Sequence, residues 1–213
     1  MRIQEKTDSM KSNKFTSKMF WLAAAAVLAG VMVFALGASA GQKQRNFIVT
    51  ERSYALPEVT LVDSEGQAVE FPGITSNSGR TVISFIFTSC AGICPMITAN
   101  MARAEPQLDA LGDDYQILLI SVDPEHDTPE RLREYARRFK TGARIRFLTG
   151  DQEDVFNVLR SMEALYEGSN KMNHQPVTLI SRSERNSWMR IDGLIGSEVL
   201  IEQYQKLMDT QAG

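Results

Sequence analysis

Two cysteines, the only ones in the chain, are separated by three residues in the segment Cys90-Ala-Gly-Ile-Cys94-Pro95. The apolar run before them, residues 81–87, is typical of a buried strand, and residues 96–111 behind them are predicted to form a helix. A turn between a strand and a helix presents backbone N–H groups to whatever binds there. Because thiolates are nucleophiles, metal ligands and disulfide partners, the pattern indicates copper binding or thiol–disulfide exchange.

The spacing of the cysteines is wider than the two-residue gap of the usual redox pair. If Cys94 lies in the first helical turn and Cys90 just before it, both side chains can face one side. A disulfide needs its sulfurs ~2 Å apart. Two sulfurs on one metal can stand further apart, up to twice a metal–sulfur bond of ~2.3 Å. The wider loop therefore permits both a disulfide and metal ligation.

The remaining elements predict an α/β fold. Residues 57–71 alternate apolar and polar residues around a turn, which predicts a hairpin. Further strands are predicted at 115–122, 144–148, 176–180 and 188–191. Further helices are predicted to start at Asp127, Asp151 and Ser197, each of which should cap its helix. Gly142 should end the helix that starts at Asp127. Strand–helix alternation followed by an antiparallel pair favours a thioredoxin-like mixed sheet, with the cysteines at the first strand-to-helix turn.

His174 is the candidate third ligand. It lies in Asn173-His-Gln-Pro176, just before a predicted strand, and in a thioredoxin-like sheet that loop packs beside the cysteine turn. Two thiolates with one imidazole suit both copper(I) and copper(II), whereas structural zinc usually has four protein ligands. The alternative is a loop histidine bonded to backbone. Pro176 is a candidate for a cis peptide bond.

Other potential ligands have simpler explanations. Met96, Met101 and Met172 could offer soft sulfur, but the first two fit helix packing. His126 lies in a polar loop and is expected to be solvated. Asp123 and Asp127 are explained by roles in a turn and a helix cap.

The N-terminus differs from the rest of the chain. Residues 1–18 carry five basic and two acidic residues, and residues 19–41 contain no charge. That run is close to the ~20 apolar residues that cross a bilayer as a helix, and the charge bias places the N-terminus in the cytoplasm. It is either one transmembrane anchor or a signal sequence cut after Ala40. Both exported forms place the body in a bacterial periplasm, membrane-bound in the first and free in the second.

The 213 residues are enough for one domain with an extension. We predict a cytoplasmic basic segment at 1–18, the anchor or signal at 19–41, a tether at 42–56 and a thioredoxin-like domain at 57–213. The net charge of −3, with no basic stripe in the body, argues against nucleic acid as a partner.

The motifs together resemble the Sco/SenC family. The resemblance rests on Phe85-Ile-Phe-Thr-Ser-Cys-Ala-Gly-Ile-Cys-Pro95, on Ser121-Val-Asp-Pro-Glu-His-Asp-Thr-Pro-Glu130 and on His174 before a strand. It implies a membrane-anchored, thioredoxin-like domain that binds copper through Cys90, Cys94 and His174. It also implies a role in assembling the copper centre of cytochrome c oxidase, with that oxidase's copper-site subunit or another copper protein as partner.

Two other functions stay open at this stage. Some members of the family look more like thiol–disulfide reductases, in which Cys90 and Cys94 would be catalytic and His174 dispensable. The third possibility is a protein-binding module with an inert disulfide. Rapid alkylation after mild reduction would argue against the inert form.

Overall fold

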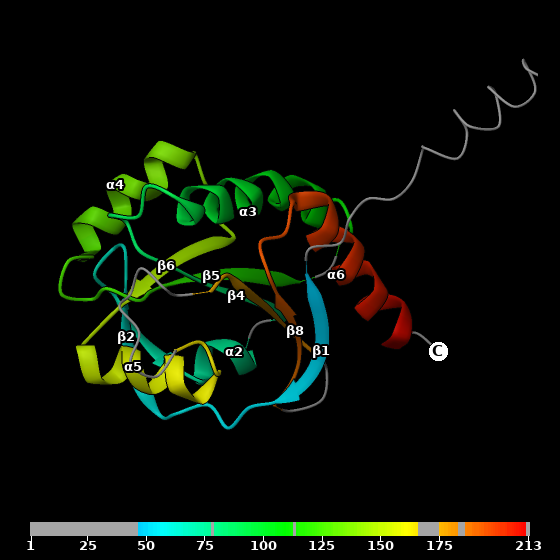
Figure 1. Cartoon of the computed structure of the whole chain (residues 1–213), viewed down its shortest axis with the longest axis horizontal. Coiled ribbons are helices and arrows are strands. Elements are labelled where there is room, and N and C mark those ends of the chain that lie inside the picture. The colour runs from blue at the N-terminus through cyan, green and yellow to red at the C-terminus, as the bar shows by residue number, and fades with distance from the viewer. Residues whose placement is uncertain (1–46, 78, 113, 166–174, 183–185, 212–213) are drawn as a thin grey trace, which may run out of the picture. The chain divides into compact units, whose positions relative to one another are not determined.

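The computed structural model describes residues 47–77, 79–112, 114–165, 175–182 and 186–211. These residues form one eight-stranded mixed sheet with helices on both faces (Figure 1). The strands are β1 (Ile48–Ser53), β2 (Val59–Asp63), β3 (Ala68–Phe71), β4 (Arg80–Ile86), β5 (Tyr115–Ser121), β6 (Ile145–Thr149), β7 (Val177–Ser181) and β8 (Ser187–Asp192). The helices are α2 (Gly73–Asn77), α3 (Ile93–Asp109), α4 (Pro129–Phe139), α5 (Gln152–Ser161) and α6 (Ser197–Gln211).

The strand order is β1-β8-β7-β4-β5-β6-β2-β3. Strands β4, β5 and β6 are parallel and are joined through α3 and α4, while β7 and β8 continue the sheet in antiparallel pairing. Helices α3, α4 and α6 lie on one face, and α2 and α5 on the other (Figure 1). The mixed α/β, thioredoxin-like sheet is thereby confirmed, as is the hairpin of β2 with β3.

The central strands are covered on both faces, which explains their composition. Every residue of β5 is buried, and so is every residue of β4 after Arg80. A parallel strand covered by helices on both faces has no solvent side, so apolar residues occupy nearly every position. These two strands end side by side, and the segments that follow them meet at the cysteine turn.

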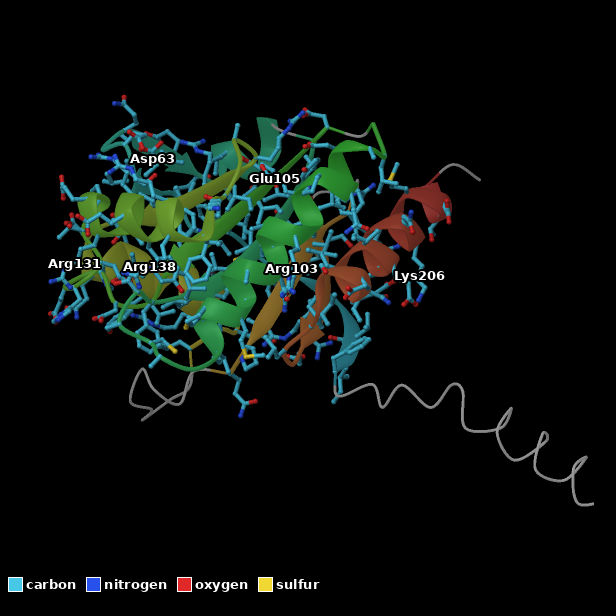
Figure 2. The ribbon with its side chains drawn as sticks, turned by 90° about the horizontal axis from the view of Figure 1, so that it is seen from above. Asp63, Arg103, Glu105, Arg131, Arg138 and Lys206 are labelled. Carbon is cyan, nitrogen blue, oxygen red and sulfur yellow. The ribbon has the colours of Figure 1, made fainter. Side chains whose placement is uncertain are left out.

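Helix α4 is amphipathic. Leu132 and Tyr135 are buried, whereas Arg131 and Arg138 are exposed and project from the helix on the outside of the molecule (Figure 2). The helix begins one residue later than the sequence predicts, because the side chain of Thr128, and not that of Asp127, accepts the N–H of Arg131. It ends at Phe139, followed by Lys140 with φ of 52°, rather than at Gly142.

Strand β1 and the short helix α2 do not follow from the sequence pattern. Residues 48–53 lie in the segment predicted as a tether, and that prediction is wrong for them, because they pair with β8 along its whole length. All six side chains of β1 are exposed or half-buried. A strand with no buried face has no hydrophobic alternation, so only pairing with its neighbour identifies it.

The predicted anchor or signal, residues 19–41, lies outside the described residues. Among the residues that the structure describes, no helix combines the length and the apolar character required to cross a bilayer.

Candidate functional site

The two cysteines are brought together where β4 gives way to α3. Cys94 is the second residue of α3 and has no exposed surface, while Cys90 lies four residues earlier and is 9% exposed. Both are free thiols. Gly92, at the cap position, has no side chain to accept an N–H group of the helix, and its own N–H donates to the Sγ of Cys90 at 3.4 Å. The first helical turn thus faces a sulfur instead of an oxygen cap, as expected at a turn that binds an electron-rich group.

The environment of Cys90 favours its thiolate. Burial alone would raise the pKa of this thiol, but hydrogen bonds outweigh it and lower the pKa below the ordinary value. The donors are the backbone N–H groups of Cys94, Gly92 and Ile93, together with the thiol of Cys94. N–H groups directed at the sulfur stabilise negative charge on it. Cys90 is therefore the thiol that ionises first.

Cys94 behaves in the opposite way. Burial raises the pKa of its thiol to about 12, and the sulfur of Cys90 and the charge of Asp127 add to the increase. A backbone hydrogen bond at Phe87 opposes them without cancelling them. The free protein thus holds two buried sulfurs, of which Cys90 ionises more readily and Cys94 stays protonated at neutral pH.

Asp127 holds this turn in place from a distance in sequence. Its carboxylate is fully buried and accepts the backbone N–H of Thr88 at 3.0 Å, the hydroxyl of Thr88, and the hydroxyl of Ser121 at 2.6 Å. Asp127 thus joins the loop after β4 to the end of β5. The sequence prediction of a capping role for Asp127 is wrong. The signal that could have found the true role is an aspartate two residues before the helix-starting Pro129, with Thr128 available as the cap.

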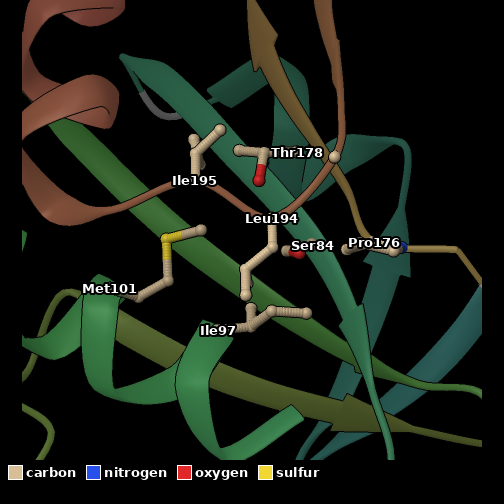
Figure 3. A pocket seen from close by; sticks show the side chains of 8 residues that line it. Ser84, Ile97, Met101, Pro176, Thr178, Leu194 and Ile195 are labelled. Atoms are coloured by element: carbon tan, nitrogen blue, oxygen red, sulfur yellow. The ribbon is translucent and has the colours of Figure 1, made fainter. Parts of the chain in front are cut away.

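The other candidate ligands are distributed as follows. His126 is exposed, as predicted. Met96 is 51% exposed on the first turn of α3, so the packing role predicted for it is wrong, whereas Met101 is buried beneath the same helix. In Figure 3, Met101 lies with Ile97 and Leu194 around a small pocket between α3 and the segment before α6. Met101 is therefore a packing residue, as expected.

His174 and Met172 lie outside the described residues, so the predicted three-ligand set stays a prediction. Among the described residues no peptide bond is cis, so the bond before Pro176 is trans and the cis prediction is wrong. No cluster of three or more His, Cys, Asp or Glu side chains suited to a metal occurs in the described part of the chain. Among the described residues, Cys90 and Cys94 could offer two sulfur ligands to a metal, which would need further donors for a higher coordination number.

The SCO1/SenC family model matches residues 50–209, which is most of the chain and includes both cysteines and His174. The chain belongs to the SCO1/SenC family. The match begins inside β1, the strand that the sequence pattern did not reveal.

Relatives of this SCO1/SenC protein support the same assignment. The SCO1 protein homolog of Bacillus subtilis is 30% identical over 69% of this chain and 76% of the relative. A protein of Stutzerimonas stutzeri, named as a candidate copper-binding protein, is 32% identical over 56% of this chain, and the match spans only 57% of its length.

Solved structures have the same fold. BsSco, described as a member of the Sco family of cytochrome c oxidase assembly proteins with a disulfide switch, has a TM-score of 0.61 at 25% identity. It covers 75% of this chain and 96% of its own. Arabidopsis thaliana ScoI with copper bound has a TM-score of 0.62 at 25% identity, over 75% of this chain and 99% of its own.

Proposed function

We propose that this protein binds copper and passes it to the copper centre of cytochrome c oxidase, with the oxidase's copper-site subunit as its partner. The observation that carries the proposal is the pair of free, buried thiols of Cys90 and Cys94 on one turn. Thiolates are soft ligands and favour copper(I) over the harder divalent ions. Membership of a family with a copper-bound member of the same fold supports this choice of metal.

His174 is the proposed third ligand. Strand β7 pairs antiparallel with β4, and Ser84 lies opposite Thr178. If the same register is continued beyond that pair, position 174 comes opposite Thr88, two residues before Cys90. Directly opposite residues have Cβ atoms ~5 Å apart, so an imidazole at this position would be within reach of the cysteine turn. The direction of β7 therefore supports a Cys₂His site.

The two thiols suit a stepwise transfer. Cys90 is the more exposed sulfur, so a thiolate of the partner would approach the copper from its side and displace it first. Cys94, with no exposed surface, would release the metal last. Because each incoming ligand replaces an outgoing one, the copper never has to become free in solution.

Copper titration of the full-length reduced protein tests this proposal. We expect one copper per chain and, with copper(II), a sulfur-to-copper charge-transfer band. His174→Ala should weaken copper(II) binding by about 10- to 100-fold, because copper(II) prefers the nitrogen ligand. His126→Ala is the matched control and should change nothing. Unchanged copper(II) binding in His174→Ala would remove His174 from the site.

A second candidate function, thiol–disulfide reduction, is favoured by the opposite pKa shifts of Cys90 and Cys94. The Cys90 thiolate would attack a target disulfide and release one target sulfur as a thiolate, which takes a proton. Cys94 would then lose its proton and attack the Sγ of Cys90. The target leaves as a dithiol, and its two electrons have come from the thiols of Cys90 and Cys94, which are now joined in a disulfide.

A trapping experiment separates the two functions. Cys94→Ser should accumulate a mixed disulfide between Cys90 and the target if reduction is the function, since no resolving thiol remains. The Cys90→Ser variant is the control and should trap nothing. Activity that needs His174 and copper would instead argue against the reductase.

We also propose that residues 19–41 direct the domain to the bacterial periplasm, either as an inner-membrane anchor or as a signal cut after Ala40. The basic residues of 1–18 support this orientation. Membrane fractions washed with alkaline carbonate should retain an anchored chain. A cut chain should be soluble in the periplasm, with Gly41 as its first residue. Recovery of the chain in the cytoplasm would contradict both forms.

A further inference from the structure

Tyr135 carries a buried hydroxyl that the packing of its ring does not explain. The residue lies on α4 and is 3% exposed. Its ring packs against that of Phe139, with the ring centroids 4.8 Å apart, and against that of Phe147, at 6.1 Å. A phenylalanine would make the same ring contacts, so the aromatic cluster accounts for the ring of Tyr135 but not for its hydroxyl.

No hydrogen bond satisfies this hydroxyl among the residues that the structure describes. Burial raises the pKa of Tyr135 to about 12, and the neighbouring hydroxyl of Thr98 opposes the increase, but their contact lacks hydrogen-bond geometry. Thr98 instead donates its one proton to the carbonyl of Cys94 at 3.0 Å. Because a buried hydroxyl without a partner lowers stability, its presence calls for a reason outside the packing of the fold.

The same hydroxyl lies on the side of α3 that carries Cys94. Cys94 and Thr98 are four residues apart on that helix, so their side chains are neighbours on one face. Helix α4 packs against α3 and brings Tyr135 beside Thr98. Negative charge on the sulfurs of Cys94 and Cys90 adds to the raised pKa of Tyr135, so both sulfurs lie within electrostatic reach of its hydroxyl.

Copper binding would change the charge beside this hydroxyl. A cysteine ligates a metal as the thiolate, so two thiolates around one copper(I) leave a net negative charge at a buried site. The N–H of Gly92 already donates to Cys90 at 3.4 Å. The hydroxyl of Tyr135 has no acceptor among the described residues, so it can turn its proton toward the new charge without breaking a bond.

We propose that Tyr135 tunes the copper site by directing its O–H dipole at the copper-bound thiolates of Cys90 and Cys94. The inference rests on the proposed function, which is copper binding by these two thiols, and it does not depend on the identity of a third ligand. In the copper-free protein the hydroxyl destabilises the fold, and copper binding gives it the negative partner that it lacks.

Tyr135→Phe in the full-length reduced protein tests the inference. Copper(I) affinity, measured by competition with a chromophoric chelator, should fall by about tenfold, because donors directed at charged groups stabilise them more than neutral groups. With copper(II), the sulfur-to-copper charge-transfer band should move to longer wavelength, because the sulfur electrons lose the stabilisation that the dipole gives. The urea midpoint of the copper-free protein should stay unchanged or rise, because the variant keeps the ring and removes an unpartnered hydroxyl.

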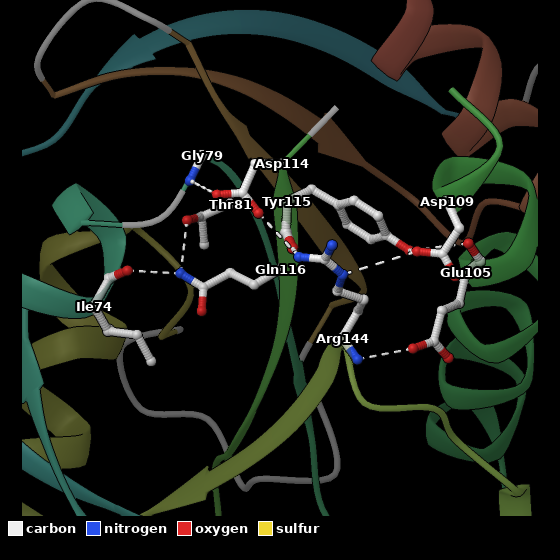
Figure 4. A network of polar contacts seen from close by, with 9 residues as sticks. All are labelled: Ile74, Gly79, Thr81, Glu105, Asp109, Asp114, Tyr115, Gln116 and Arg144. Carbon is white, nitrogen blue, oxygen red and sulfur yellow. Dashed lines mark hydrogen bonds and ion pairs between the residues drawn. The ribbon is translucent and has the colours of Figure 1, made fainter. Parts of the chain in front are cut away.

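Tyr115→Phe is the matched control, because it removes the same atom from a second buried tyrosine. The hydroxyl of Tyr115 bonds to the carbonyl of Glu105 and to the carboxylate of Asp109, both at 2.9 Å, at the amino end of β5 (Figure 4). This variant should lower the urea midpoint and leave the copper affinity and the charge-transfer band unchanged. The two substitutions should therefore have opposite signatures.

Either of two results would overturn the inference. The first is wild-type copper(I) affinity, or an unshifted charge-transfer band, in Tyr135→Phe. The second is a lower urea midpoint for copper-free Tyr135→Phe, like that expected for Tyr115→Phe, which would show that a structural bond holds the hydroxyl. Failure of the proposed function is recognised separately, because the wild-type protein itself would then bind no copper.

Discussion

The amino and carboxyl ends of the central strands β4 and β5 differ in the hydrogen-bond partners of their polar groups and thiols. At the amino ends, Glu105 accepts the N–H group of Gly142 at 2.7 Å. Glu105 also accepts the N–H group of Arg144 at 2.9 Å, and the hydroxyl of Tyr115 donates to Asp109 (Figure 4). Arg144 also pairs with Asp114. At the carboxyl ends, the thiols of Cys90 and Cys94 face N–H groups and each other.

The partners at the amino end stabilise the fold, whereas those at the cysteine end favour reactivity. At the amino end, charges of both signs and their donors satisfy one another, which leaves little capacity for a ligand. At the cysteine end, donors are directed at a sulfur that can also bind a metal or another sulfur. Glu105 is as buried as the two cysteines, so for these three residues the kind of partner, rather than exposure, distinguishes the functional end.

The largest expected effect is in the pH dependence of thiol modification. The pKa of Cys90 is lowered and that of Cys94 is raised to about 12. Iodoacetamide should therefore label Cys90 at pH values below 9.0, the ordinary pKa of the thiol. Cys94 should react slower by roughly a thousandfold at pH 8, as its thiolate is scarce. Mass spectrometry of the reduced protein measures both rates. Equal rates would remove the pKa asymmetry that favours the thiol–disulfide reductase.

The pKa shifts of Cys90 and Cys94 change the stability of the fold in opposite directions as the pH rises. Because the native state keeps the proton on Cys94, its contribution is present below pH 9 and is lost as the pH rises toward 12. Cys90 favours the charged form, so its contribution is present above pH 9 and is lost as the pH falls through its lowered pKa.

Asp127→Asn should have the next largest effect. The substitution replaces one carboxylate oxygen by a donor that faces the N–H and hydroxyl groups of Thr88 and Ser121, and should cost about 2–3 kcal/mol of stability. Copper affinity should fall by about tenfold or more because the turn is no longer held. Urea unfolding and copper titration measure the two effects. Glu125→Gln, in the same loop but exposed, is the control.

Glu105→Gln changes the opposite end of the sheet. It should lower the free energy of unfolding by about 1–3 kcal/mol, because one of the two N–H groups of Gly142 and Arg144 loses its acceptor. Copper affinity should stay unchanged. A loss of copper binding here would show that the two ends of the strands are coupled, and would contradict the comparison.

The smallest expected effect belongs to Thr128→Ala. The substitution removes the side-chain cap of α4 and should cost about 1 kcal/mol, measured by urea unfolding, with copper binding unchanged. Thr128 and Asp127 are adjacent, so comparing their two substitutions distinguishes the effect of losing a helix cap from the effect of losing a residue that holds the cysteine turn. Equal effects of both substitutions on copper would contradict that distinction.

Local patterns predicted much of this fold. The apolar runs of β4 and β5, the hairpin and the approximate starts of the helices follow from periodicity and from residues close in sequence, although Asp127 is not the cap of α4 and Asp151 makes no side-chain cap bond. The prediction failed for β1, which has no buried face, and for Asp127, whose partners Thr88 and Ser121 lie on other segments. A local sequence pattern, which spans about ten residues, cannot show that Asp127 bonds to Thr88, because Thr88 lies 39 residues away in sequence.

The sequence by itself determined that two thiols share a turn between a strand and a helix, because that depends only on local spacing. Only the tertiary structure decided how they differ. Burial of Cys94 and the charge of Asp127 raise one pKa, while N–H groups directed at Cys90 lower the other. Desolvation, nearby charges and hydrogen bonds all shift a pKa, and each of them comes from atoms that the fold brings next to the thiol and not from the cysteine itself.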